Sequence, residues 1–113
     1  MERKWLVGAA TLLTAAAVAA EKPTPFWNLT SSTVVSLRLS HAGSGVYGDN
    51  VALGDADGID HDERLKIADL PSGRYDLELK FKGGRACFVH NIEIVTQKVF
   101  SVEDKALVAC SKK

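Results

Sequence analysis

Acidic side chains are crowded into one short stretch, residues 55–63, which reads DADGIDHDE. Carboxylate oxygens are the ligands that Ca²⁺ prefers in proteins. The stretch does not fit the EF-hand calcium loop, because placing Gly58 at the required glycine puts Leu53 and Arg64 at the first and last ligand positions. We therefore expect either a solvated loop or an irregular calcium site. The carboxylates that would form such a site belong to Asp55, Asp57, Asp60 and Asp62.

The histidines form no catalytic signature by their spacing. His41 follows Ser40, His61 lies among the acidic residues, and His90 falls in a predicted strand. A histidine beside carboxylates can act as a base or bind a metal, and His61 is the best placed of the three. The sequence contains no nucleophile elbow, no Cys-x-x-Cys motif and no zinc-ligand spacing. These observations favour a protein that is not an enzyme.

A glycine-rich stretch, residues 41–50, contains the spacing G-x-G-x-x-G at Gly43, Gly45 and Gly48. In nucleotide-binding folds this spacing follows a strand and opens a helix. No helical pattern follows here, so the stretch predicts a loop between strands. Loops of this kind are where binding surfaces concentrate.

The start of the chain has the composition of a secretory signal peptide. Basic residues precede an apolar, alanine-rich run, which ends in small residues at an expected cleavage site near Ala20. The run is shorter than the roughly 20 residues that a membrane-spanning helix needs, so any membrane link would be through an uncleaved segment. The sequence therefore predicts a signal peptide over residues 1–20 and one domain over residues 21–113, located in the periplasm or secreted.

Both cysteines, Cys87 and Cys110, lie in the predicted exported domain. Two cysteines in an oxidising compartment usually pair, and the ligand spacing does not favour a metal site. Closing the loop of about 22 residues between them stabilises a fold by roughly 3 kcal/mol in the chain-entropy description. We therefore expect a Cys87–Cys110 disulfide, with two free thiols as the alternative.

The charge of the domain is close to zero. The chain has 14 Lys and Arg and 14 Asp and Glu, and loss of Glu2, Arg3 and Lys4 leaves a net charge of −1. A near-neutral domain has no electrostatic attraction for nucleic acid or for an anionic membrane surface. The expected partner is therefore a protein or a component of the cell envelope.

The strongest structural signal is a hairpin within residues 70–95. Apolar and charged residues alternate along its first strand, which is the pattern of a strand with one buried face. Gly83 and Gly84 tolerate the backbone angles of a tight turn. The inward residues of this strand are Tyr75, Leu77, Leu79 and Phe81.

The turn length decides where Cys87 points. A two-residue turn would place it on the charged face, whereas a three-residue or bulged turn places it on the Phe81 side. We expect the second arrangement, because a disulfide in a small sandwich usually lies in or under the core. A bulge near His90 and Asn91 would turn Phe88 outward and keep the apolar residues of this strand on one face. Those residues are Cys87, Val89, Ile92 and Ile94.

Shorter apolar runs predict the other strands. In residues 34–40, Val35, Leu37 and Leu39 alternate with polar residues and are expected to point inward. Short strands separated by turns are typical of an all-β fold, here a small antiparallel β-sandwich of about six to eight strands, immunoglobulin-like or transthyretin-like, after a signal-peptide helix. The remaining strands are predicted over residues 26–30, 64–70, 98–102 and 106–110.

Several motifs occur in an order that resembles a group of small exported proteobacterial proteins of unknown function. The motifs are F-W-N-x-T, V-x-x-L-x-x-S, G-V-Y-G-D-N-V-x-L-G-D, L-P-x-G-R-Y-D-L and G-G-R-x-C. Tyr47-Gly48 stands where that group usually has Trp-Gly, and Gly83-Gly84 where it has Asp-Gly. The resemblance implies export and a β-rich fold, and it implies no activity. The run L-P-S-G-R-Y-D-L-E-L is also similar to the last hairpin of transthyretin-like and collagen-adhesin-B-like sandwiches, a likeness of fold alone.

These observations predict an exported, non-enzymatic β-sandwich that acts as a binding or envelope-associated accessory module. Its contact surface would be the edge strands together with residues 41–50 and 55–64. One alternative is a module that binds Ca²⁺ or another metal through residues 55–63. The other is a small secreted enzyme or enzyme inhibitor.

Overall fold

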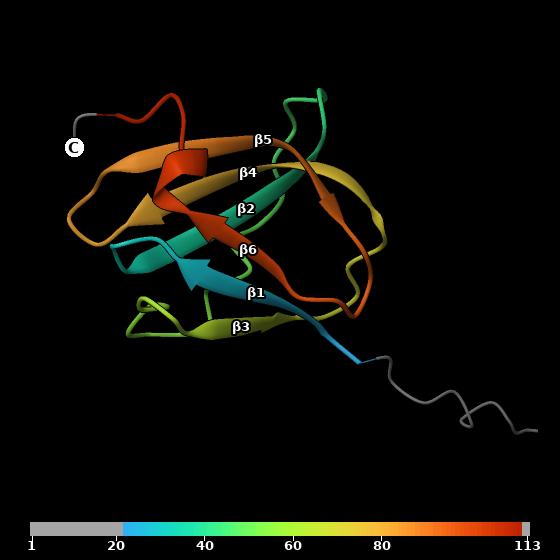
Figure 1. Ribbon diagram of the computed structural model, residues 1–113, viewed down its shortest axis with the longest axis horizontal. Coiled ribbons are helices and arrows are strands. Elements are labelled where there is room, and N and C mark those ends of the chain that lie inside the picture. The colour runs from blue at the N-terminus through green and yellow to red at the C-terminus, as the bar shows by residue number, and fades with distance from the viewer. Residues whose placement is uncertain (1–21, 112–113) are drawn as a thin grey trace, which may run out of the picture.

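The computed structural model describes residues 22–111, which form two three-stranded β-sheets packed face to face (Figure 1). The predicted all-β sandwich is thereby confirmed, and the predicted signal peptide lies outside the described residues. No helix in the described part is long and apolar enough to cross a bilayer. The first sheet has the order β3-β1-β6, from Arg64–Ile67, Thr24–Leu29 and Phe100–Glu103. The second has the order β2-β4-β5, from Val34–His41, Gly73–Phe81 and Ala86–Ile94.

Strand direction follows the connections. The pairs β1–β3, β2–β4 and β4–β5 are antiparallel, whereas β1 and β6, the first and last strands within residues 22–111, are parallel. Parallel neighbours need a long crossover, and here the crossover is the entire second sheet together with β3. The two ends of the domain are therefore joined through one sheet.

The core lies between the sheets and takes alternate residues from each strand. In β1 every second residue points inward, so that Phe26 is buried and its ring centre lies 5.5 Å from that of Phe100. All four residues of β4 that the alternation predicts to be inward are buried. Burying one large apolar side chain stabilises a fold by about 1.5–3 kcal/mol. The largest fully buried apolar side chains include Phe26, Leu37, Ile59, Leu77, Leu79 and Ile94.

The turn between β4 and β5 has three residues, as expected. The N–H of Phe81 donates to the carbonyl of Arg85 at 2.8 Å, and Gly83 and Gly84 both have positive φ angles. This parity places Cys87 opposite Leu79, on the core face, where it is fully buried. The predicted orientation of Cys87 is confirmed.

The predicted bulge in β5 is also present. Asp76 of β4 lies opposite two residues, His90 and Asn91, and Asn91 has a φ of 58°. One extra residue on β5 restores the inward direction after Val89, so that Ile94 is again buried.

The expectation for Val35 was wrong. Val34 is buried and Val35 is 39% exposed, because a register shift lies between Val34 and Ser36 where β2 begins. Val34 also exchanges two backbone hydrogen bonds of 2.9 and 2.8 Å with Ile59, in the distant acidic stretch. This non-local pairing turns the first residue of β2 into the core.

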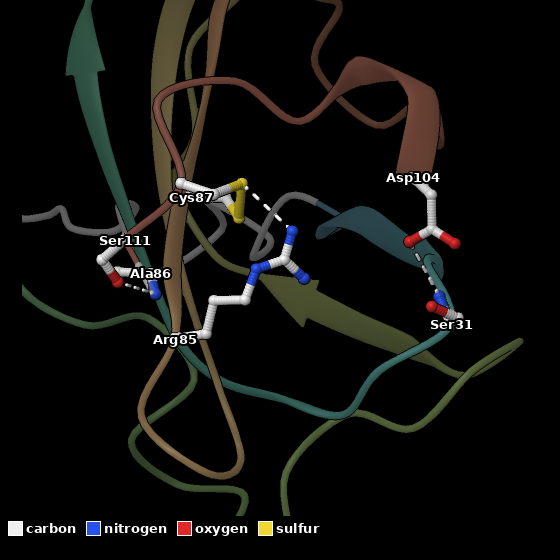
Figure 2. Close-up of a disulfide and its surroundings, with 7 residues drawn as sticks. Ser31, Arg85, Ala86, Cys87, Asp104 and Ser111 are labelled. Atoms are coloured by element: carbon white, nitrogen blue, oxygen red, sulfur yellow. Dashed lines mark hydrogen bonds between the residues drawn. A yellow bond between two sulfur atoms is a disulfide. The ribbon is translucent and has the colours of Figure 1, made fainter. Parts of the chain in front are cut away.

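The prediction of a strand over residues 106–110 was also wrong, although the predicted disulfide through Cys110 is present. A 3₁₀ helix, Asp104–Ala106, follows β6, and only a single bridge joins Val108 to Phe88. The segment then reaches the Cys87–Cys110 disulfide, shown with the Arg85 guanidinium beside the sulfurs in Figure 2. The C-terminal segment thus lies along the start of β5.

Candidate functional site

The chain between β2 and β3 covers the outer edge of β2. The N–H of Gly48 donates to the carbonyl of Leu39 at 2.9 Å. The N–H of Val51 donates to the carbonyl of Leu37 at the same distance. The segment therefore takes the place that a further strand would occupy beside β2 in the second sheet.

The side chain of Asn50 fixes this path. Its Oδ1 accepts the N–H of Leu37 at 2.9 Å and the N–H of Ala52 at 2.8 Å. Among the described residues, no hydrogen bond joins residues 48–59 to β3. The covering segment is thus hydrogen-bonded to the edge of β2 and not to the edge of β3.

Two adjoining depressions lie between β3 and this segment. The first has a volume of about 520 Å³, with residues 54–56 and 64–66 in its walls. The second, about 300 Å³, extends past Ile67 to His41 and Tyr75. Val51 lines both, so they form one open groove along the outer edge of β3, which we call the β3 trough.

The β3 trough has an apolar floor and charged rims. Leu65 and Val51 are half-buried and pack against the core. Arg64 and Lys66 are exposed on the β3 side. This combination suits a ligand that carries both apolar and charged groups. Because the groove is open, such a ligand would lie along it and would not be enclosed. The acidic residues that line the remaining rim are Asp49, Asp55 and Asp69.

Arg64 is oriented by its neighbours. Its guanidinium carbon lies 4.5 Å from the centre of the Trp27 ring, and the Trp27 indole N–H donates to Asp62 Oδ1 at 3.0 Å. Exposed cation–π contacts contribute about 0.5–1 kcal/mol, which is enough to favour one side-chain position. The Arg64 guanidinium is therefore held over the Trp27 ring of β1.

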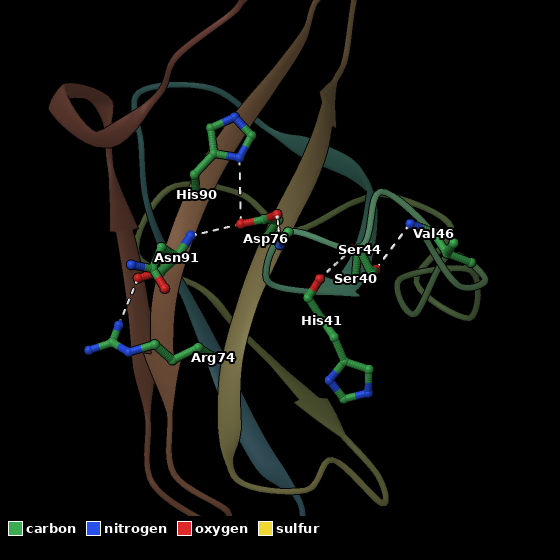
Figure 3. Close-up of polar contacts among 9 residues, drawn as sticks. Ser40, His41, Ser44, Val46, Arg74, Asp76, His90 and Asn91 are labelled. Carbon is green, nitrogen blue, oxygen red and sulfur yellow. Dashed lines mark hydrogen bonds and ion pairs between the residues drawn. The ribbon is translucent and has the colours of Figure 1, made fainter.

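A second polar cluster, shown in Figure 3, centres on the carboxylate of Asp76 in β4. Its Oδ2 accepts the N–H of Gly43 at 3.0 Å, and its Oδ1 accepts the N–H of Asn91 at 2.8 Å. His90 Nδ1 lies 3.5 Å from the same carboxylate. Asp76 therefore ties the glycine-rich loop to the bulge of β5.

These contacts lower the pKa of Asp76 below its ordinary value. The backbone N–H of Gly43 contributes most and that of Asn91 next, because both donate to the ionised form. Partial burial opposes this change, and His90 adds a smaller lowering effect. The carboxylate is thus ionised at neutral pH and acts as a fixed acceptor.

The glycine-rich loop also covers the outer face of the second sheet. The Tyr47 ring lies edge-on to Phe88, with ring centres 6.0 Å apart, and His90 stacks on Phe88 at the same distance. Burial, followed by the charges of Asp76 and Glu78, raises the pKa of Tyr47. Phe88 points outward as predicted, and these two rings shield it.

Ser40 and His41 do not form a nucleophile and base. The Ser40 hydroxyl contacts the carbonyl of His41 and the hydroxyl of Ser44, both at 2.9 Å (Figure 3). The imidazole of His41 stacks on Tyr75 with ring centres 5.2 Å apart. Tyr75 in turn donates its hydroxyl to the carbonyl of Pro71 at 2.7 Å, and burial raises its pKa. His41 and Tyr75 together line one end of the β3 trough.

Two of the candidate calcium ligands already have partners. Asp60 Oδ1 accepts the hydroxyl of Thr33 at 2.6 Å. Asp62 Oδ1 accepts the Trp27 indole. Both contacts tie the acidic stretch to strands or turns of the sandwich.

The other two candidates lie elsewhere in the same loop. Asp55 stands at the wall of the β3 trough, and Asp57 is exposed. Within residues 22–111, no group of three or more potential metal-ligating side chains converges. The structure does not bring the four carboxylates together, and a calcium site over this stretch stays a prediction.

His61 has a partner of its own. Its Nδ1 lies 2.9 Å from the carbonyl of Thr30. Nearby Asn28 is fully buried and donates its amide to the carbonyls of Ser32 and Ile59 at 2.8 and 2.7 Å. The polar groups around the acidic stretch therefore hold the loop against β1.

Sequence reasoning did not single out Asp76 or the trough floor. The alternation along β4 placed Asp76 on the charged, solvent-facing side, yet it is only 8% exposed because the glycine-rich loop covers it. The signal available was the bulge, which leaves an N–H in need of an acceptor near Asn91. Comparison with known proteins gives no further guide, because no family model, curated protein or solved structure matches this chain.

Proposed function

We propose that this protein is an exported, non-enzymatic binding module that contacts a protein or another cell-envelope component through the β3 trough. The observation that carries the proposal is the position of the two adjoining depressions along one sheet edge. The covering segment bonds to β2 and leaves β3 accessible. An open, amphipathic groove at a sheet edge is a common site of protein recognition.

The disulfide supports export. Cys87–Cys110 joins a buried residue of β5 to the exposed end of the domain. Disulfides of this kind persist in oxidising compartments and are rare where thiols are kept reduced. The fold is compatible with the periplasm or the medium outside the cell.

The engagement of the polar side chains supports a binding role rather than catalysis. Several groups that could supply a nucleophile, a base or an acid already have hydrogen-bond partners within the protein: Ser40 bonds to Ser44, His61 to Thr30, and Asp76 to two backbone N–H groups. A catalytic base needs a free lone pair within hydrogen-bond reach of a substrate. These groups instead position the loops that border the trough.

Photocrosslinking in cells that produce the protein tests the proposal. A photoreactive amino acid replaces Ala56, which is exposed at the wall of the β3 trough, or Lys98, which is exposed in the β5–β6 turn and serves as the control. We expect a discrete crosslinked product from position 56 and none from position 98. Products from both positions alike, or none from position 56, would contradict the proposal.

A further inference from the structure

The backbone of β3 presents hydrogen-bonding groups to the trough. The N–H of Asn28 donates to the carbonyl of Glu63 at 2.9 Å, which marks a hydrogen-bonded position of the β1–β3 pair. Such positions recur at every second residue, so the backbone of Leu65 faces β1 and that of Arg64 and Lys66 faces away. Lys66 lies opposite Pro25, which has no N–H to donate, in agreement with this parity.

These outward groups have no partner in the described part of the chain. Among residues 22–111, no backbone or side-chain hydrogen bond reaches the N–H or carbonyl of Arg64 or Lys66 from the trough side. By contrast, the outer edge of β5 is covered where Phe88 exchanges two hydrogen bonds of 2.8 Å with Val108. The β3 edge is thus accessible for further pairing.

The two sheets are also unequal on this flank. The second sheet is extended beside β2 by the covering segment, whereas the first sheet ends at β3. The trough lies where one more strand of the first sheet would pack over that segment, with Val51 as its floor. The shape of the trough and the exposed backbone groups of β3 are therefore both those that an additional strand beside β3 would need.

We propose that the β3 trough takes an extended polypeptide segment of a partner protein, which adds to β3 as a fourth strand and alternates acidic with apolar side chains. This inference rests on the proposed function and names the class of ligand. Side chains of an added strand alternate between the two faces of the sheet. One set would lie beside the exposed Arg64 and Lys66, where carboxylates are favoured, and the other would lie on Leu65 and Val51.

The same charges disfavour a second copy of this chain as the occupant. Pairing β3 with its own copy would bring Arg64 and Lys66 of one molecule close to the same residues of the other. Like charges that face each other across strands are destabilising, and edge lysines are a common means of preventing self-pairing. The two cations on β3 itself are complementary to an acidic strand, whereas the aspartates of the trough lie on its remaining rim.

The test uses the disulfide-bonded protein and a synthetic six-residue peptide of alternating glutamate and valine, blocked at both ends. Amide hydrogen exchange is followed by NMR. At nine-tenths occupancy, we expect exchange at Arg64 and Lys66 to slow about tenfold, because only the unoccupied fraction exchanges. A lysine–valine peptide should give much weaker protection. Equal protection by both peptides, or protection at another edge only, would overturn the proposal.

Variants of Lys66 separate backbone from charge. Lys66→Pro removes the outward N–H, which an edge strand tolerates, and should weaken glutamate–valine binding about tenfold. Lys66→Ala keeps the N–H and should weaken binding less. Lys80→Ala removes the same charge from the exposed face of the second sheet and should leave binding unchanged. Unaltered binding to Lys66→Pro would refute strand addition.

If Lys66→Pro does not fold, a second peptide replaces this variant in the test. It is the glutamate–valine peptide methylated on the backbone nitrogens that would face β3. We expect this methylated peptide not to bind, and full retention of its affinity would exclude pairing through the backbone. Crosslinking from position 56 without protection of Arg64 and Lys66 would overturn strand addition and leave the proposed function standing. Absence of both signals would overturn both.

Discussion

The carboxylate of Asp76 accepts the backbone N–H of Gly43 at 3.0 Å, across 33 residues of sequence. The same carboxylate accepts the N–H of Asn91 in the β5 bulge. One side chain thus joins the glycine-rich loop, the central strand of the second sheet and its outer strand. The loop returns from this point to cover β2 and to form a wall of the β3 trough.

Replacement of Asp76 by Ala should loosen the loop and lower stability. Both N–H donors would lose their acceptor, and an unsatisfied donor is costly wherever water cannot replace the partner fully. We expect a melting temperature lower by several degrees and faster amide exchange at Gly43 and Asn91. Asp57→Ala removes an exposed carboxylate and is the matched control, expected to change neither quantity. Unchanged exchange at Gly43 would show that Asp76 does not hold the loop.

Acidification should weaken this contact in a defined direction. The pKa of Asp76 is lower in the folded protein than in the unfolded chain, so its stabilising effect is complete above the unfolded value and is lost as the pH falls through the folded value. The difference in melting temperature between the wild type and Asp76→Asn should therefore be constant from about pH 7 to 5 and shrink below about pH 4. His90 Nδ1 lies 3.5 Å from this carboxylate, so the series is repeated in His90→Gln. A gap that widens in acid would contradict the assignment.

The local features of the sandwich could be predicted because they depend on short periods. The alternation that ends at Phe81 and the three-residue turn through Gly83 fix the orientation of Cys87 within a few residues of sequence. Pairing of Cys87 with Cys110 followed because the chain has two cysteines. Each of these inferences needed little knowledge of distant contacts.

The errors and omissions arise from long-range contacts. Val34 turns inward because Ile59 pairs with it across the loop. After β6 the chain forms a 3₁₀ helix that begins at Asp104, rather than the predicted strand. The carboxylate of Asp104 accepts the N–H of Ser31, 73 residues earlier in the sequence. Asp76 is covered by a loop that begins on another strand. The β3 trough lies between β3 and the segment that covers β2, so no short sequence pattern predicts it.

Removal of the disulfide should destabilise the domain without abolishing the hairpin. Cys110→Ser avoids placing a hydroxyl in the core, because Cys110 is exposed whereas Cys87 is fully buried. The chain-entropy description predicts a loss of roughly 3 kcal/mol in the free energy of unfolding. Urea denaturation measures it, and reduction of the wild type should give a similar loss. Arg85→Ala removes the guanidinium beside Cys110 and keeps the bridge, so it should cost far less.

Calcium should leave the melting temperature unchanged. The carboxylates of Asp60 and Asp62 are directed at Thr33 and Trp27 rather than at a common point. A bound ion would raise the midpoint, because a ligand that binds only the folded state stabilises it. Melts with EDTA and with millimolar Ca²⁺ decide the matter. A rise of several degrees that Asp60→Asn removes would establish the calcium site that the sequence suggested.

Gly58, the glycine of the acidic stretch, should not tolerate replacement by a residue with a side chain. It has a φ of +82°, and a Cβ added there would lie 2.7 Å from Thr33 Cγ2 and 2.9 Å from the carbonyl oxygen of Val34. The backbone oxygen cannot move without disturbing the Val34–Ile59 pairing. Positive φ alone costs about 1–3 kcal/mol for other residues, so Gly58→Ala should lose at least that much stability in urea denaturation.

Gly54→Ala provides the matched control for this prediction. A Cβ at Gly54 meets no atom within 4 Å, and the residue does not have a positive φ angle. Replacing glycine by alanine at a compatible site stabilises a protein by about 0.4–1 kcal/mol through the unfolded chain. The two variants should therefore change stability in opposite directions. Equal effects would mean that the acidic stretch is not held against β2 at Gly58, and the wall of the β3 trough would lose its anchor.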